Sequence, residues 1–181
     1  MNKMIKPIIC AFVLLISYTS TAQKNYELET NYMNCMCSLF DDEGAKFKSL
    51  IKEAEQNLIA AELLANTHGE SYIALFKNIR TSIDGRVANF GISDYVVNTL
   101  LDSKNVKKYS ICMDSILKSP SFENSKLKKF ITLSSSGNNP KITDLTSKML
   151  EILEAKDFEH NFYKYLTFSL IDKFNAANKK Q

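Results

Sequence analysis

The chain has 181 residues, of which 45% are hydrophobic and 24% are charged, a composition too apolar for an intrinsically disordered protein. It contains only five glycines and three prolines, too few turn-forming residues for a β-sandwich or a β-barrel. Its net charge of +3 lacks the basic surplus of a dedicated nucleic-acid-binding protein. Composition therefore predicts an all-α protein that does not bind nucleic acid.

The start of the chain has the pattern of a secretory signal peptide. Lys3 and Lys6 precede nine consecutive apolar residues, Ile8–Ile16, and small residues then lead to Ala22. A transmembrane anchor needs about 20 apolar residues, so this run is too short to span a membrane. Cys10 lies inside the run, without the small residues that precede a lipid-modified cysteine. We therefore predict cleavage after Ala22 and export to the periplasm or the extracellular space.

Residues 23–181 would form the mature protein. Removal of residues 1–22 takes away two lysines and no acidic residue, so the mature chain is nearly neutral. Its length is that of one ordinary domain. The polar stretch Ser134–Asn139 is interpreted as a flexible loop within this domain, because the 42 residues after it are few for an independent core. A linker between two domains is the alternative.

Hydrophobic spacing predicts helices throughout this domain. The strongest apolar stripe repeats at intervals of three and four residues from Phe47 to Ala65, with Leu58 at its centre. Ser93 is the expected N-cap of another helix. The other predicted helices span Tyr26–Phe40, Glu70–Ile83, Asp94–Asp102, Val106–Lys118, Asn124–Leu133, Lys141–Lys156 and Phe158–Asn175. We predict about seven or eight short helices that stack as antiparallel hairpins.

Three cysteines follow the signal peptide: Cys35, Cys37 and Cys112. An odd number in an exported protein leaves one disulfide and a spare thiol, or no disulfide at all. Cys35 and Cys37 lie about 200° apart around one helix, so they cannot both face the same neighbouring helix. The longer apolar stripe of that helix carries Cys37, and Cys112 lies at the edge of an apolar face. We therefore predict a Cys37–Cys112 disulfide and a free thiol at Cys35.

Sulfur-containing residues also cluster at Met33–Cys37 and at Cys112–Met113, and thiolate and thioether groups are the soft ligands that select Cu(I). Met33 and Cys37 are four residues apart, which suits chelation from one helix face. Cys35 and Met36 point elsewhere, and methionine is an ordinary core residue. Copper binding is therefore an alternative function, and we assign no metal ligand and no cofactor.

Catalytic patterns are scarce in this chain. Its only imidazole bases are His68, in a predicted turn, and His160, which we expect in solvent on the polar side of the last helix. No H-E-x-x-H, G-x-S-x-G or phosphate-binding-loop pattern occurs. We assign no catalytic residue and favour a non-enzymatic protein, with an enzyme of unrecognised type as the alternative.

The last predicted helix is rich in aromatic residues, which we interpret as core; an aromatic-lined pocket for an apolar ligand is the alternative. Small groups of lysines near residues 104–108 and 126–129 are interpreted as solvated faces. The sequence therefore predicts an exported helical binding or interaction domain. Its partner would be another protein or a small apolar ligand.

Overall fold

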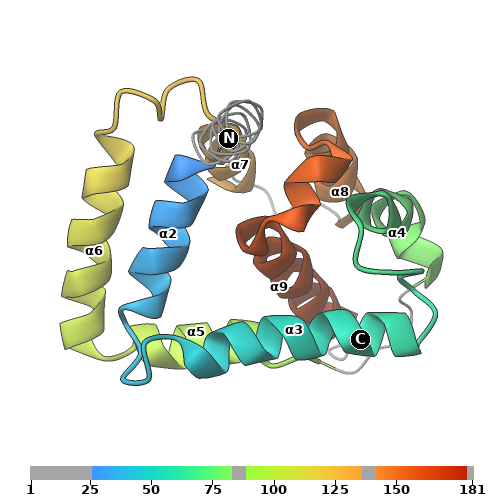
Figure 1. The fold of residues 1–181 in the computed structure, drawn as a ribbon, viewed down its shortest axis with the longest axis horizontal. Coiled ribbons are helices and arrows are strands. Elements are labelled where there is room, and N and C mark those ends of the chain that lie inside the picture. The colour runs from blue at the N-terminus through green and yellow to red at the C-terminus, as the bar shows by residue number, and fades with distance from the viewer. Residues whose placement is uncertain (1–25, 83–88, 136–141, 179–181) are drawn as a thin grey trace, which may run out of the picture.

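The computed structural model describes residues 26–82, 89–135 and 142–178, and the regular structure in these residues is entirely helical (Figure 1). The prediction of an all-α protein is confirmed for this part of the chain. The helices in chain order are α2 (Glu27–Cys37), α3 (Ala45–Ala60), α4 (Gly69–Ser82), α5 (Ile92–Leu100), α6 (Ser103–Leu117), α7 (Lys126–Ser135), α8 (Ile142–Ile152), the 3₁₀ helix η1 (Ala155–Glu159) and α9 (Asn161–Asn178).

Two predicted features fall wholly or partly outside the described residues. The predicted signal peptide, residues 1–22, lies outside them, as do residues 136–139 of the predicted flexible loop. Ser134 and Ser135 belong to α7, so this helix extends past the predicted start of the loop. Within the described ranges, no helix has both the length and the hydropathy needed to span a bilayer.

Helix α9 is the central element of the packing. It contacts α2, α3, α5 and η1, while α3 runs along one edge of the molecule beneath α2 and α9 (Figure 1). Helix α6 covers the outer side of α2, and α4 packs on α8 and η1. We also expected consecutive helices to stack as antiparallel hairpins, and this stays a prediction. The helices that pack on α2 and α4 come from distant parts of the sequence, not from the next helix along the chain.

The aromatic residues of η1 and α9 form the centre of the core. Phe158 and Phe168 are fully buried, as is Tyr163, and Phe162 is only 1% exposed. Rings from other helices pack against them; Tyr72 of α4, for example, stacks on Phe158 with ring centroids 5.5 Å apart. The interpretation of the last helix as a core helix is confirmed.

Helix α3 ends earlier than its apolar stripe predicts, at Ala60 rather than near Ala65. Beyond its end, the N–H of Leu63 donates to the carbonyl of Leu58, and Glu62 adopts a left-handed φ of 58°. These are the features of a Schellman motif, which closes a helix by satisfying its last carbonyl groups. Apolar residues continue past the end of the helix because Leu64 is buried and Leu63 packs against the core, whereas Ala65 is exposed.

Helix α5 begins at Ile92 and is capped from a distant part of the chain. The carboxylate of Asp172, on α9, accepts hydrogen bonds from the N–H groups of Phe90, Ile92 and Ser93 at 2.6, 3.0 and 3.2 Å. A carboxylate at this position satisfies free N–H groups and interacts favourably with the helix dipole. The predicted N-cap at Ser93 is therefore wrong: Gly91 occupies that position, and the capping side chain is Asp172.

Gly69 begins α4 where this helix touches η1. A side-chain carbon at position 69 would lie 1.7 Å from the carbonyl oxygen of Ala155, far inside van der Waals contact. Glycine is therefore the residue that lets the two backbones meet. This contact fixes η1, which carries one of the residues of the site described next.

Candidate functional site

A cleft of about 380 Å³ opens where the start of α2 meets η1 and the turn that leads into α7. Its volume falls in the range of small-molecule sites, roughly 300–1,000 Å³. Most of its lining is polar or charged, and Leu28 is the one aliphatic residue in it. The lining residues are Tyr26, Glu27, Leu28, Glu29, Ser121, Asn124, Ser125, Lys126, Lys156 and Asp157.

Asp157 connects the three walls of this cleft. It is 1% exposed, and the backbone N–H of Glu154 donates to its Oδ2 at 2.6 Å as part of a capping box that shapes η1. The hydroxyl of Tyr26 donates to Oδ1 at 2.7 Å, and Nζ of Lys126 donates to Oδ2 at 2.6 Å. One buried carboxylate therefore holds the start of α2 and the start of α7 against η1.

The environment of Tyr26 keeps its hydroxyl protonated. Burial raises the pKa of Tyr26 well above its usual range, and the hydrogen bond to Asp157 raises it further. The phenol therefore acts as a hydrogen-bond donor at every physiological pH. Lys126 compensates the charge of Asp157, and removing one partner of such a pair leaves the other charge uncompensated.

Glu29 is the second buried carboxylate of the cleft. It is 4% exposed, and its Oε1 accepts a hydrogen bond of 2.6 Å from the hydroxyl of Tyr163 on α9. Burial raises the pKa of Tyr163, and the hydrogen bond to Glu29 contributes in the same direction. Glu27 follows Tyr26 in the lining of the cleft. It is exposed, in the first turn of α2. Negative charge at this helix end is favourable for the helix dipole.

His160 lies beside this site and is half-buried, so the expectation that it lies in solvent is wrong. Its ring stacks on Tyr26 with centroids 5.2 Å apart. The N–H of Phe162 donates to Nδ1 at 3.2 Å, which leaves Nε2 as the protonated nitrogen that faces Oγ1 of Thr30, also at 3.2 Å. The imidazole thus serves as a neutral link between α2 and α9. His68, by contrast, lies exposed in the turn before α4.

Burial gives His160 a testable effect on stability. Desolvation lowers the pKa of His160, so the unfolded chain binds this proton more tightly than the folded chain. The free energy of unfolding should therefore decrease as the pH falls from about 7.5 through the ordinary histidine range near 6.5. Urea unfolding of His160→Gln should show a weaker decrease than the unmodified protein. His68→Gln, at an exposed site, is the control; an equal change in both variants would contradict this assignment.

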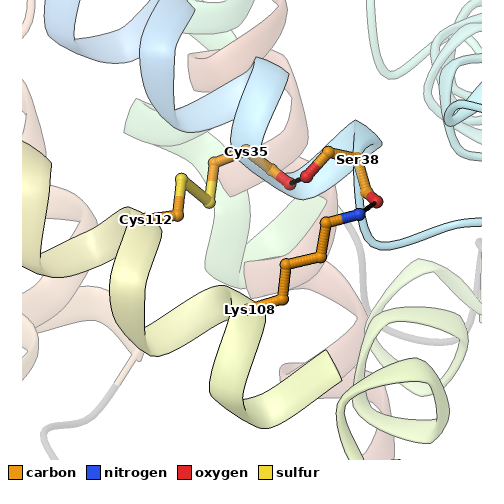
Figure 2. The surroundings of a disulfide bond; sticks show 4 residues. All are labelled: Cys35, Ser38, Lys108 and Cys112. Atoms are coloured by element: carbon orange, nitrogen blue, oxygen red, sulfur yellow. Dashed lines mark hydrogen bonds between the residues drawn. A yellow bond between two sulfur atoms is a disulfide. The ribbon is translucent and has the colours of Figure 1, made fainter. Parts of the chain in front are cut away.

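The structure contains a disulfide, but it joins Cys35 to Cys112, with Cα atoms 6.1 Å apart (Figure 2). The predicted Cys37–Cys112 pairing is therefore wrong: Cys112 is bonded, Cys35 is its partner, and Cys37 is the free thiol. Near the disulfide, Nζ of Lys108 donates to the carbonyl of Ser38, which adds a second link from α6 to the end of α2 (Figure 2).

The orientation of α2 explains why Cys35, rather than Cys37, pairs with Cys112. Its longer apolar stripe, which includes Met33 and Cys37, belongs to the side that packs on α9, as the Glu29–Tyr163 hydrogen bond shows. The shorter stripe with Cys35 is the side covered by α6. Cys37 is buried against Gly44 in the turn to α3, and this burial raises the pKa of its thiol.

The other predicted candidates do not come together in a site. Cys35 and Cys112 are bonded to each other, so neither is a thiolate ligand in this structure. The described residues contain no group of three or more His, Cys, Asp or Glu side chains placed to hold a metal ion. On α9, Phe162, Tyr163, Tyr165 and Phe168 are core residues, and none of these four lines the cleft.

A second, more open groove of about 460 Å³ lies between α7 and α8. Its lining consists of Glu123, Lys128, Lys129, Thr132, Leu133, Lys148, Glu151 and Ile152. None of these side chains is fully buried, and Lys128 pairs with Glu123. Without a buried polar group to orient a ligand, this groove is the weaker candidate.

The residues of the cleft were not identified from the sequence. Tyr26 and Asp157 are 131 residues apart, and so no local pattern links them. The spacing of Glu154 and Asp157 indicates a capping box, which is a local structural signal rather than a functional one. Comparisons of the chain with protein-family models, with curated proteins and with solved structures found no match.

Proposed function

We propose that this protein is an exported, non-enzymatic binding domain and that the cleft between α2, α7 and η1 is its ligand site. The observation that carries the proposal is the pair of buried carboxylates, Glu29 and Asp157, in the wall of a cleft of ligand size. Burying a carboxylate is costly unless hydrogen bonds compensate it. Tyr163 and Tyr26 provide such bonds, and they hold both carboxylates in fixed positions.

The chemistry of the lining favours binding over catalysis. Asp157 already accepts three hydrogen bonds from the protein, and the raised pKa of Tyr26 makes its hydroxyl a poor acid for catalysis near neutral pH. The hydroxyl of Ser125 donates to a backbone carbonyl, and that of Ser121 bonds to another serine hydroxyl. Among the described residues, neither serine is paired with a base that would activate it as a nucleophile.

The ligand that we propose is a small polar molecule, in place of the apolar ligand that the aromatic residues of the last helix had indicated. The lining offers carboxylate, ammonium, hydroxyl and amide groups, and Leu28 is the only lining residue whose side chain is wholly aliphatic. A ligand without hydrogen-bonding groups would leave these polar groups desolvated and unpaired, which costs free energy.

Substitution at the rim of the cleft tests the ligand site. Ser121 is exposed and lines the cleft, so Ser121→Trp should block it without disturbing the core. Exposed Ser49 on α3 provides the matched control, Ser49→Trp. In a thermal-shift panel of sugars, amino acids, polyols and diamines, a ligand at 100 times its Kd adds about 2.7 kcal/mol, roughly 5 to 10 °C in Tm. We expect such a shift in the unmodified protein and in Ser49→Trp, but not in Ser121→Trp. If no compound raises the Tm of the unmodified protein, or if the same compounds also raise the Tm of Ser121→Trp, the cleft is not the ligand site.

Export is tested independently of the cleft. The charged start, the apolar run and the small residues up to Ala22 support removal of residues 1–22. Intact-mass analysis of protein secreted by its native host should therefore give a chain that begins at Gln23, as glutamine or as pyroglutamate. Exported material that still carries Met1 would contradict the proposal.

A further inference from the structure

Exposed apolar side chains gather in one part of the molecule. Single exposed aliphatic residues are normal on protein surfaces, whereas a group of them marks an interaction surface. Helix α6 lies at the edge of the molecule and packs on α2 and α5 (Figure 1). In the described ranges, the large hydrophobic residues that are exposed all lie on α5, on α6 or in the turn between them, with exposed fractions from 45% to 75%: Val97, Leu101, Val106, Ile111 and Leu117.

The disulfide shows which side of α6 faces outward. Cys112 and Ile116 mark the inner side, since Cys112 is bonded to α2 and Ile116 is buried. Successive residues of a helix are about 100° apart, so Val106, Ile111 and Leu117 lie within about 140° of one another on the opposite side. They extend over roughly 16 Å of the helix. These three residues therefore define one outer face of α6.

The outer face of α6 is also basic. Lys104, Lys107 and Lys118 are exposed and lie within about 60° of one another around the helix, with Ile111 between Lys118 and Lys104. Lys118 pairs with Asp114 at 2.6 Å, while Lys104 and Lys107 form no ion pair with another described residue. Residues 103–118 contain four lysines and one aspartate, a net charge of +3 that equals the net charge of the whole chain.

We infer that the outer face of α6 binds the surface of a membrane that contains anionic lipids. Such a surface has an apolar layer directly beneath a layer of negatively charged headgroups. The aliphatic side chains of the outer face can enter the apolar layer, while the ammonium groups of the lysines between them stay with the phosphates. The cleft takes no residue from α6, so this inference is independent of the proposed ligand site.

Other partners fit the outer face less well. Lysine is depleted at protein–protein interfaces, where aromatic residues and arginine are enriched, and the outer face has neither. A second copy of the chain, related by a two-fold axis, would place lysines against lysines. A soluble polyanion would attract the lysines but leave the aliphatic side chains in water. An anionic membrane satisfies both kinds of side chain.

Cosedimentation with vesicles tests the role of charge. The vesicles contain phosphatidylglycerol and phosphatidylcholine in equal amounts, and phosphatidylcholine alone is the uncharged comparison. Each lysine near an anionic surface changes affinity about fivefold, so Lys104→Gln combined with Lys107→Gln should weaken binding about 25-fold. Lys48→Gln combined with Lys52→Gln, at exposed positions of α3, is the matched control and should have little effect. All variants are made in the same chain, so residues 1–22 contribute equally to each.

A fluorescent residue tests whether the apolar side chains enter the lipid. The chain has no tryptophan, so Ile111→Trp introduces a single indole on the outer face. Its emission should shift to shorter wavelength on anionic vesicles, because the indole leaves water for the interfacial region. Ser49→Trp, at an exposed position of α3, is the control and should not shift. Ile111→Ser should weaken vesicle binding about tenfold, and circular dichroism checks that this exposed substitution leaves the fold intact.

Equal binding to the two kinds of vesicle, or equal losses in the two double variants, would overturn the inference. An unshifted emission of Ile111→Trp in the vesicle-bound protein would overturn it as well. Dextran sulfate that binds as tightly as the anionic vesicles, with the same affinity for Ile111→Ser, would show a soluble polyanion to be the partner instead. If no vesicle binds the protein and sedimentation equilibrium finds a dimer that Ile111→Ser dissociates, the outer face binds a second copy.

Discussion

Reduction of the Cys35–Cys112 disulfide should lower the free energy of unfolding by about 3 to 5 kcal/mol. The bond joins residues separated by 77 positions, so it removes many conformations from the unfolded chain. It also anchors α6, whose one buried residue is Ile116. Because α6 has so little core of its own, we expect it to depend on the covalent link more than the central helices do.

Urea unfolding with and without reductant measures this effect. Cys112→Ser should lose stability by a similar amount, and reductant should not change the unfolding of this variant, which makes it the control. Alkylation should label Cys37 only slowly in the folded protein, since this thiol is buried and its pKa is raised. A Cys112→Ser variant within about 1 kcal/mol of the unmodified protein would fall below the usual range for a disulfide and contradict the prediction.

Leu58→Ala should destabilise the protein by about 2 to 5 kcal/mol. Leu58 lies in α3 and is 0% exposed, so the shorter side chain leaves a cavity as well as losing buried apolar surface. Leu101→Ala is the matched control, because Leu101 is 75% exposed and its truncation should cost less than about 0.5 kcal/mol. Equal losses of stability in the two variants, measured by chemical unfolding, would show that the apolar stripe of α3 does not face the core.

The sequence predicted the helices well because helical periodicity is a local property. On α3, the stripe from Phe47 to Leu58 occupies the core, as do Tyr163 and Phe168 of α9, and their spacing indicates this. The ends of the helices were less predictable where the determining contact is distant. Nothing near Ser93 indicates that Asp172, about 80 residues away, caps α5.

The cysteines illustrate the same distinction. The helical spacing correctly indicated that Cys35 and Cys37 face different neighbours, since this follows from two residues on one helix. Which of these faces meets α6 depends on the packing of the whole domain, and the length of the apolar stripe was a misleading guide to it. The cleft was unpredictable for the same reason, because Tyr26, Lys126 and Asp157 belong to three separate elements.

The central position of α9 has a consequence for the order in which the protein can fold during synthesis. Glu29, Glu55 and the start of α5 are all made early, and their partners on α9 are Tyr163, Lys164 and Asp172. A ribosome produces the chain from its N-terminus, so these hydrogen bonds to α9 form only after the last helix emerges, although Glu55 can already accept from the hydroxyl of Tyr72 on α4. The same holds for the core, because α2, α3 and α5 pack on α9. The contacts that complete the core can therefore form only after nearly the whole chain has been made.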